Sequence, residues 1–203
     1  MDSSRKYTAA TICVQGGWQP KNGEPRVLPI YQSTTFKYDS SEQMARLFDL
    51  EESGYFYTRL QNPTNDAVAS KIAALEGGTG AMLTSSGQAA NFYSIANICQ
   101  AGDHIVAQKT IYGGSYNLLA HTLAQFGVET TFVDAHDLEA VASAIRPNTK
   151  AVYLETLGNP NSDIPDIDAI AQIAHAHGLP LVIDNTFGTP YLIRPIAHGA
   201  DIV

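Results

Sequence analysis

The sequence predicts an α/β fold in which helices cover both faces of a mostly parallel sheet, giving three layers. Short apolar runs alternate with helix-forming segments about five times from residue 81 onward, as they do in βαβ units. The run 181–184 is apolar throughout until its final carboxylate, which is typical of a strand buried on both faces of a parallel sheet. Polar residues follow several of these runs, at the strand ends where open α/β sheets bind ligands.

The boundaries of the elements follow from the apolar pattern and from turn and capping residues. The expected strands cover residues 81–84, 104–107, 129–133, 151–155 and 181–184. The expected helices cover residues 65–76, 89–98, 115–126, 138–145 and 167–177, with Thr64 or Asn65 capping the first and Asp137 capping the fourth. Residues 201–203 resemble the opening of another strand, and a chain that stops inside a strand leaves ladder partners unmade. We therefore expect this sequence to be a piece of a longer protein.

Residues 1–53 are expected to form an extended N-terminal arm with one short helix. Glycines and prolines interrupt the apolar pattern repeatedly, and Ser40 or Ser41 is placed to cap a helix whose apolar side consists of Met44, Leu47, Phe48 and Leu50. A largely irregular stretch of this length is unusual in a compact domain unless it has a role. Packing against another subunit is such a role, and residues 54–203 are then the first part of the ligand-binding domain.

Composition excludes several classes of protein. The chain of 203 residues is 44% hydrophobic, which is ample for a core. Its net charge of −8 argues against nucleic acid or an anionic membrane as its main partner. It shows no secretory leader and no apolar run as long as a membrane span, so we expect a cytoplasmic protein. The two cysteines give no disulfide framework. His175 and His177 point about 200° apart on a helix, so no metal site is expected.

The turn 85–88 precedes a predicted helix and is a candidate anion site. Backbone N–H groups and the positive end of the helix dipole would meet a negative ligand at Ser86, Gly87 and Gln88. The pattern is neither a dinucleotide fingerprint nor a P-loop, nor the nucleophile elbow of hydrolases. A second anion-binding candidate is Tyr57 with Arg59, since a phenol and a forked guanidinium suit phosphate; the alternative is an edge segment with a solvated arginine.

Further candidates follow the other predicted strands. Tyr112 is either a core aromatic residue or a stacking platform with a titratable hydroxyl. Asp184 is either a ligand-binding group or a buried charge held by a partner. Together with Asn159 and Thr186, these residues suit a flat anionic ligand that needs a ring contact and a carboxylate beside a ring nitrogen. Pyridoxal 5'-phosphate is such a ligand.

The motifs resemble those of the Cys/Met-metabolism family of pyridoxal-phosphate enzymes. They are Tyr57-x-Arg59-x-x-Asn62-Pro63-Thr64, Ser85-Ser86-Gly87-Gln88-Ala89-Ala90, Tyr112-Gly113-Gly114, Glu155-Thr156-x-Gly158-Asn159-Pro160 and Asp184-Asn185-Thr186. The resemblance runs from Thr11 to Val203, and within the family the motifs are most similar to those of O-acetylhomoserine sulfhydrylases. It implies the large domain of the fold type I, or pyridoxal-phosphate-dependent transferase-like, architecture.

The resemblance also implies a role for each candidate residue. At the phosphate, Gly87 and Gln88 beside Ser86 would offer backbone amides, while Tyr57 and Arg59 would reach the phosphate of a neighbouring subunit. At the ring, Tyr112 would stack and assist proton transfer at the leaving group, Asp184 would pair with the pyridine nitrogen, and Asn159 and Thr186 would hold the other polar edge. The implied assembly is a homotetramer built of dimers that share active sites.

The implied reaction is γ-replacement on O-acetyl-L-homoserine by sulfide, which gives L-homocysteine and acetate in methionine biosynthesis. Methionine γ-lyase and cystathionine γ-synthase or lyase activities are alternatives, and a catalytically inactive fragment or binding remnant is an alternative of another class. The resemblance places the Schiff-base lysine a few residues after Val203, and Lys109 does not match its motif. It places the arginine for the substrate carboxylate in a later domain. We therefore expect the 203-residue chain alone to be inactive.

Overall fold

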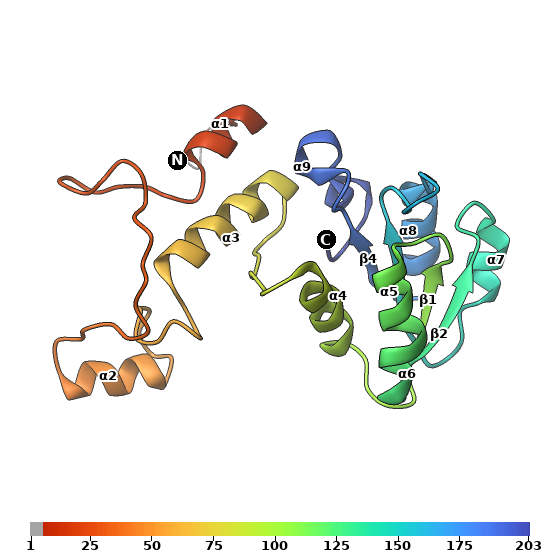
Figure 1. Cartoon of the computed structure of the whole chain (residues 1–203), viewed down its shortest axis with the longest axis horizontal. Coiled ribbons are helices and arrows are strands. Elements are labelled where there is room, and N and C mark those ends of the chain that lie inside the picture. Colours follow the sequence, from red (N-terminus) through yellow and green to blue (C-terminus); the bar gives the residue numbers. More distant parts are fainter. Residues whose placement is uncertain (1–5) are drawn as a thin grey trace. The chain divides into compact units, whose positions relative to one another are not determined.

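The computed structural model describes residues 6–203, which form two compact units: the chain up to Leu83, and Thr84–Val203. The first five residues of the expected arm lie outside the described residues. The second unit contains the sheet (Figure 1) and, by their exposed fractions, most of the buried apolar side chains. No helix within residues 6–203 combines the length and the apolar character needed to cross a membrane.

The sheet of the second unit is parallel, as predicted. It has four strands in the order β2-β1-β3-β4, and these are β1 (His104–Gln108), β2 (Glu129–Val133), β3 (Thr149–Glu155) and β4 (Leu181–Asp184). Ile202 forms a parallel bridge with Val182 beside β4, where the sequence predicted the opening of another strand. The chain leaves β1 toward β2 on one side and returns to β3 on the other, so the direction of winding reverses between β1 and β3.

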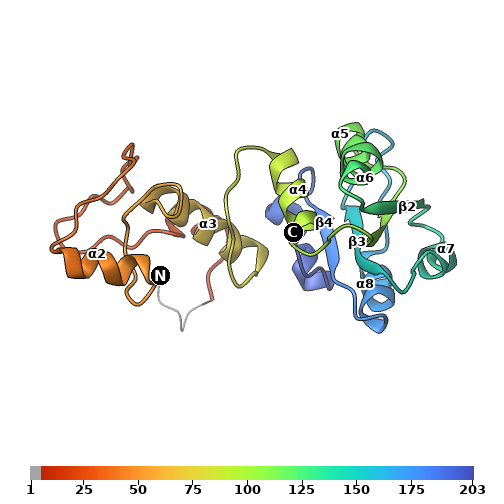
Figure 2. The same cartoon turned by 90° about the horizontal axis from the view of Figure 1, so that it is seen from below.

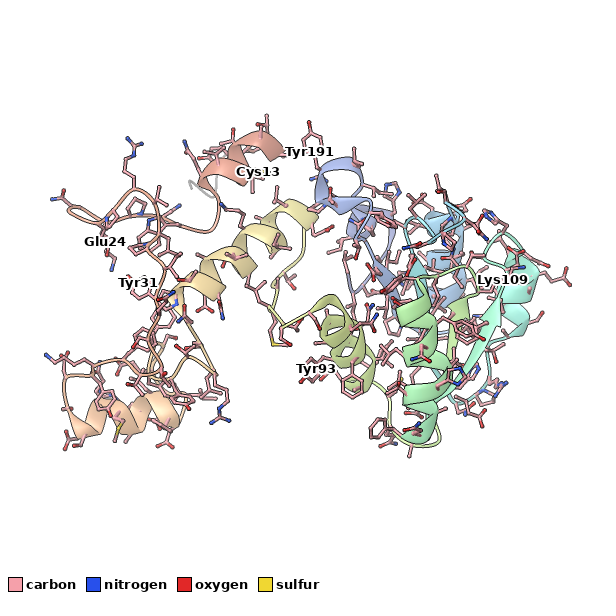
Figure 3. The ribbon with its side chains drawn as sticks, viewed as in Figure 1. Cys13, Glu24, Tyr31, Tyr93, Lys109 and Tyr191 are labelled. Carbon is pink, nitrogen blue, oxygen red and sulfur yellow. The ribbon has the colours of Figure 1, made fainter. Side chains whose placement is uncertain are left out.

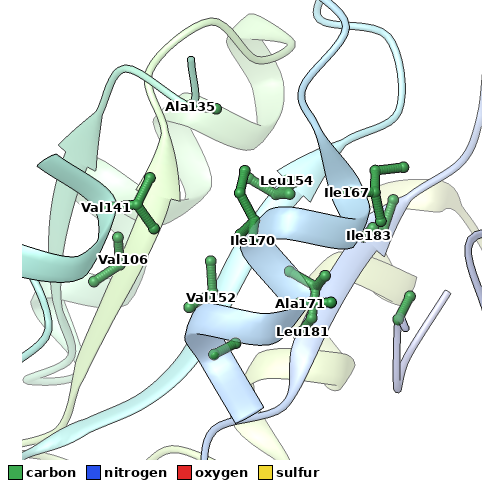
Figure 4. Packing of buried hydrophobic residues seen from close by; sticks show 12 residues of the cluster. Val106, Ala135, Val141, Val152, Leu154, Ile167, Ile170, Ala171, Leu181 and Ile183 are labelled. Atoms are coloured by element: carbon green, nitrogen blue, oxygen red, sulfur yellow. The ribbon is translucent and has the colours of Figure 1, made fainter. Parts of the chain in front are cut away.

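Helices cover both faces of this sheet, which confirms the three-layer α/β prediction (Figure 2). The helices α4 (Gly87–Ala96), α5 (Gly113–Asn117) and α6 (Leu123–Gln125) pack on one face, and α7 (Leu138–Ser143) and α8 (Ile167–Ala176) pack on the other. Successive strand side chains point to opposite faces. In β3, Val152 and Leu154 join the cluster under α8, shown in Figure 4, whereas Tyr153 joins the cluster under α4 to α6.

Several boundaries in this unit differ from the predictions. Helix α4 begins at Gly87 because the Ser86 side chain caps it, accepting a hydrogen bond from the Ala89 N–H. The predicted helix 115–126 is a composite in which a π-helical turn, Leu118–Thr122, joins α5 to α6. The short helix α9 (Thr189–Leu192) and the 3₁₀ turn Pro195–His198 were not predicted.

The predicted strand 81–84 was wrong. This stretch makes no strand pairing within the described part of the chain, and the Met82 side chain is 77% exposed. An apolar run becomes a strand only where a neighbouring strand offers ladder hydrogen bonds. The run lies at the boundary between the two units, where residues 6–203 provide no such neighbour.

Within residues 6–83, the first unit consists of three helices and irregular chain: α1 (Ala9–Gln15), α2 (Ser41–Phe48) and α3 (Pro63–Glu76). Helix α2 was predicted with its Ser40 cap, whereas α1 was not predicted. Leu50 does not belong to the apolar side of α2, since it follows the helix with a φ of 59° and is 83% exposed. Helix α3 is capped by Asn62 rather than Thr64 or Asn65, because proline fits its first turn. A subunit-contacting arm of residues 1–53 stays a prediction.

Candidate active site

A cavity of about 360 Å³ opens at the carboxyl ends of β1, β3 and β4. It lies where the winding of the sheet reverses, the position at which open α/β sheets bind ligands. All the predicted site residues of this unit line it. The lining residues are Ser86, Gly87, Gln88, Asn91, Tyr112, Glu155, Leu157, Asn159, Asp184, Thr186 and Phe187.

The N-terminus of α4 provides the anion-binding side of the cavity. The Ser86 hydroxyl satisfies the Ala89 N–H across 3.1 Å, while the N–H groups of Gly87 and Gln88, in the first turn, have no partner within the helix. A Cβ atom built on Gly87 would meet no atom within 4 Å, so open space lies beside these amides. Together with the helix dipole, this geometry suits a phosphate group.

Asp184, the last residue of β4, provides the acidic side of the cavity. Its Oδ1 accepts hydrogen bonds from the backbone N–H of Thr186, at 3.0 Å, and from the Thr186 hydroxyl. Its Oδ2 accepts one hydrogen bond from Asn91 Nδ2, at 3.1 Å. The carboxylate is therefore held at both oxygen atoms, and Thr186 donates both of the hydrogen bonds to Oδ1. A contact of Thr186 with a bound ring stays a prediction.

Glu155 organises two loops of the cavity, a role that the sequence did not indicate. Its side chain is 5% exposed and accepts hydrogen bonds from the backbone N–H groups of Tyr112, at 2.9 Å, and Asn159, at 3.3 Å. Burial raises the pKa of the Glu155 carboxyl, the Tyr112 N–H opposes that shift, and the charge of Asp184 adds to it. A glutamate that ends an apolar run is the signal that would have marked it.

The Tyr112 ring lies at the mouth of the cavity and is 51% exposed. Tyr112 is the residue just before α5, and the hydrogen bond from its backbone N–H to Glu155 fixes the position of its backbone. Lys109, which also follows β1, is not among the lining residues. Its Nζ pairs with Asp134 Oδ2 at 2.8 Å on the surface (Figure 3).

Tyr57 and Arg59 belong to the first unit. The Arg59 guanidinium lies over the Tyr57 ring, with its carbon 5.2 Å from the ring centroid, and Tyr57 forms an antiparallel bridge with Thr35. This cation–π contact brings together the two side chains that the sequence indicates as an anion-binding candidate. Their reach to a neighbouring subunit stays a prediction. Within residues 6–203, no cluster of three or more histidine, cysteine or acidic side chains is placed to hold a metal ion.

A parallel sheet with a helix N-terminus and a fixed carboxylate at one crevice is the arrangement of an α/β domain that binds a phosphorylated ligand. The comparison with known families makes this specific. The model of the family described as Cys/Met metabolism PLP-dependent enzyme matches residues 10–203. The chain belongs to this family.

Curated relatives carry more than one activity. The chain is 46% identical over 200 residues to an O-acetyl-L-homoserine sulfhydrylase of Leptospira meyeri, covering 98% of this chain and 45% of that protein. It is 54% identical over 177 residues to an L-methionine gamma-lyase of Treponema denticola, covering 86% of this chain and 44% of that protein. The chain thus spans about half the length of these relatives.

Solved structures confirm the fold. The chain matches an O-acetylhomoserine (thiol)-lyase of Campylobacter jejuni with a TM-score of 0.93 and 38% identity, over 97% of this chain and 48% of that one, and that crystal structure contains a pyridoxyl-lysine phosphate. It matches a cystathionine gamma-lyase of Lactobacillus plantarum with a TM-score of 0.85 and 39% identity, over 96% and 49% of the two chains. The predicted PLP-dependent transferase-like fold is therefore confirmed.

The cofactor of this family is pyridoxal 5'-phosphate, and the residues of the cavity fit it. The volume of about 360 Å³ is within the range of small-molecule sites. The first-turn amides of α4 suit the phosphate, the Tyr112 ring offers an aromatic face, and Asp184 offers a carboxylate for a protonated ring nitrogen. These groups stand at one cavity although they come from segments far apart in the sequence.

Proposed function

We propose that the complete protein catalyses γ-replacement on O-acetyl-L-homoserine, in which sulfide displaces acetate to give L-homocysteine. The observation that carries the cofactor-dependent part of this proposal is the cavity, where the α4 amides, Tyr112 and Asp184 stand together. The similarity to the O-acetyl-L-homoserine sulfhydrylase of Leptospira meyeri and to the O-acetylhomoserine (thiol)-lyase of Campylobacter jejuni supports the choice of reaction. The setting we propose is methionine biosynthesis in the cytoplasm.

The residues of this chain would bind and orient the cofactor. Gly87 and Gln88 would hold its phosphate through their N–H groups, with Ser86 keeping the helix start in place. Asp184 would hold the ring nitrogen and keep it protonated, and Asn159 would meet the opposite polar edge. When bound, pyridoxal phosphate supplies an electron sink that stabilises negative charge on the substrate carbon atoms.

Tyr112 would act at the leaving group. Its exposed ring would stack on the cofactor, which brings the hydroxyl to the open side of the cavity where substrate enters. From there the hydroxyl can donate a proton to the departing acetate oxygen as a general acid. The backbone bond to Glu155 limits how far this residue can swing.

A second candidate is γ-elimination from methionine, favoured by the 54% identity to the Treponema denticola methionine gamma-lyase. Cystathionine synthesis or cleavage is a further alternative within the family, and the similarity to the Lactobacillus plantarum cystathionine gamma-lyase supports cleavage. An inactive binding remnant is the alternative of another class. The cofactor cavity is common to all four, so product analysis has to separate them.

The test uses the protein expressed from its complete coding sequence. We expect a purified protein that absorbs in the visible as pyridoxal-phosphate enzymes do and forms homocysteine from O-acetylhomoserine only when sulfide is added. D184N should lower turnover at least about 100-fold by removing the charge beside the ring nitrogen, whereas D39N, at an exposed position, should not. Release of 2-oxobutanoate from methionine without sulfide-dependent homocysteine would favour the lyase, and a colourless protein would favour the remnant.

We also propose a homotetramer built of dimers in which Tyr57 and Arg59 complete the neighbour's phosphate site. Mixing two inactive variants tests this. R59A retains its own Asp184, and D184N retains its own Arg59, so a dimer of the two would contain one intact shared site. Recovery of activity on mixing supports shared sites, and no recovery in confirmed mixed dimers contradicts them.

A further inference from the structure

The Asp184 carboxylate has an unequal set of hydrogen-bond donors. Oδ1 accepts two hydrogen bonds, both from Thr186, whereas Oδ2 accepts one, from Asn91 Nδ2 at 3.1 Å. A carboxylate oxygen accepts about two hydrogen bonds. Oδ2 is therefore the oxygen with capacity for another donor, and Asn91 is the side chain that sets where Oδ2 points.

The Asn91 amide has a second partner, the Ser115 hydroxyl. The same Nδ2 group also lies 3.3 Å from Ser115 Oγ, in α5, and Ser115 is only 1% exposed. Tyr153 of β3 is also 1% exposed, and burial, followed by the charge of Asp184, raises the pKa of its phenol. The amide thus links the cavity carboxylate to a buried polar group that cannot move easily.

Helix geometry explains why Asn91 can make this link. It lies four residues after Gly87, about one turn along α4, so Asn91 and Gly87 lie on the same face of the helix. Tyr93, two residues further, is 54% exposed on the outer side of the helix (Figure 3). One helix therefore presents both the phosphate-binding amides and the side chain that holds the acid.

We propose that Asn91 is a positioning residue for Asp184: by holding Oδ2 from α4, it fixes the carboxylate in the orientation that receives the protonated ring nitrogen of the cofactor. This inference rests on the proposed function and deepens it. Ser115 supports the arrangement by fixing Asn91. The first-turn amides and Asn91 both belong to α4. The distance between the proposed phosphate position and the Asp184 carboxylate is therefore set by one rigid helix.

The probe is pyridoxine 5'-phosphate, which has the ring, nitrogen and phosphate but no aldehyde, so it cannot bond to lysine. Its ultraviolet band depends on whether the ring nitrogen is protonated, which gives a readout independent of turnover. The complete protein is compared with N91L, N91A and S115A. N97L is the matched control, because Asn97 is exposed at the other end of the same helix.

We expect N91L to bind the probe about tenfold more weakly, as loss of a bond to a charged group implies, and to release the ring proton about one pH unit lower. S115A should lower the affinity for the probe and the pH of proton release by smaller amounts. N97L should leave both the affinity and the pH of proton release at the wild-type values. If N91L does not fold, N91A carries the test, since it removes the amide without adding bulk.

Three results would overturn the proposal. Wild-type values for both N91L and N91A would show that Asp184 does not depend on Asn91, while leaving the proposed function intact. Failure of the wild-type protein to bind the probe at all would overturn the proposed function, and this inference with it. Weaker binding with an unchanged proton release would also contradict the positioning role, because a general loss of packing would explain it.

Discussion

The Glu155 carboxylate, at the end of β3, accepts a hydrogen bond of 2.9 Å from the backbone N–H of Tyr112, the residue just before α5. The two residues are 43 positions apart in the sequence. The other carboxylate oxygen accepts from the Asn159 N–H. One buried side chain thus connects the loop after β1 to the loop after β3, on both sides of the cavity.

Replacing Glu155 by glutamine should destabilise the protein by about 1–3 kcal/mol at acidic pH, since the amide NH₂ group would face a backbone donor. Burial and the charge of Asp184 raise the carboxyl pKa above its usual 4.5, so the folded state binds this proton more tightly than the unfolded state. That contribution is present below pH 4.5 and is lost as the pH rises through the raised pKa. In urea titrations, the free energy of unfolding of the wild type should therefore exceed that of E155Q by less as the pH rises.

A constant difference between wild type and E155Q from pH 4 to pH 8 would contradict this assignment. E139Q is the matched control. Glu139 is exposed in the first turn of α7, and its replacement should leave the pH dependence of unfolding as in the wild type.

Gly114 keeps room for the Tyr112 ring. A Cβ atom there would lie 2.4 Å from Tyr112 Cε1 and 2.7 Å from Gln88 Nε2, so alanine must displace side chains that line the cavity. G114A should weaken binding of pyridoxine phosphate by about tenfold, equal to about 1.4 kcal/mol. Equilibrium titration by fluorescence measures it.

The adjacent Gly113 provides the control for this substitution, because a Cβ atom there would meet no atom within 4 Å. G113A should leave binding unchanged and stabilise the protein by up to about 1 kcal/mol, the helix preference of alanine over glycine. Equal loss of binding in both variants would show that the ring position does not depend on the space at Gly114.

Ser86 should contribute to both stability and ligand binding. S86A removes the cap of α4, at a cost of about 1 kcal/mol in the free energy of unfolding. S40A removes the corresponding cap of α2 and should cost a similar amount in that unit. Only S86A should also weaken phosphate-ligand binding, and unchanged binding in S86A would argue against the α4 N-terminus as the phosphate site.

His104 should make the protein sensitive to mild acid. It is fully buried and lies 2.8 Å from the hydroxyls of both Thr149 and Thr131, so burial lowers its pKa below the usual 6.5. The stability it contributes is complete above pH 6.5 and is lost as the pH falls through the lowered pKa.

H104Q should therefore lose less stability than the wild type between pH 7 and pH 5, as measured by urea unfolding at each pH. H136Q, at an exposed histidine, should follow the wild type. Parallel pH profiles for H104Q and the wild type would show that His104 does not titrate on unfolding.

The sequence by itself determined the class of fold, the position of β2 and β4, and the chemical types at the strand ends. These depend on local patterns: apolar periodicity, capping serines and aspartates, and polar residues that follow buried runs. The motifs were local too, which is why Ser86, Tyr112 and Asp184 could be named before their proximity was known.

Tertiary structure alone decided which distant groups meet. It showed that Asn91 holds Asp184, that Glu155 holds Tyr112, and that residues 81–84 are not a strand in the described chain. A side chain on a helix carries no local sign of the carboxylate it will face, and an apolar run carries none of whether a partner strand will lie beside it. Both depend on contacts that form only when separate segments pack together.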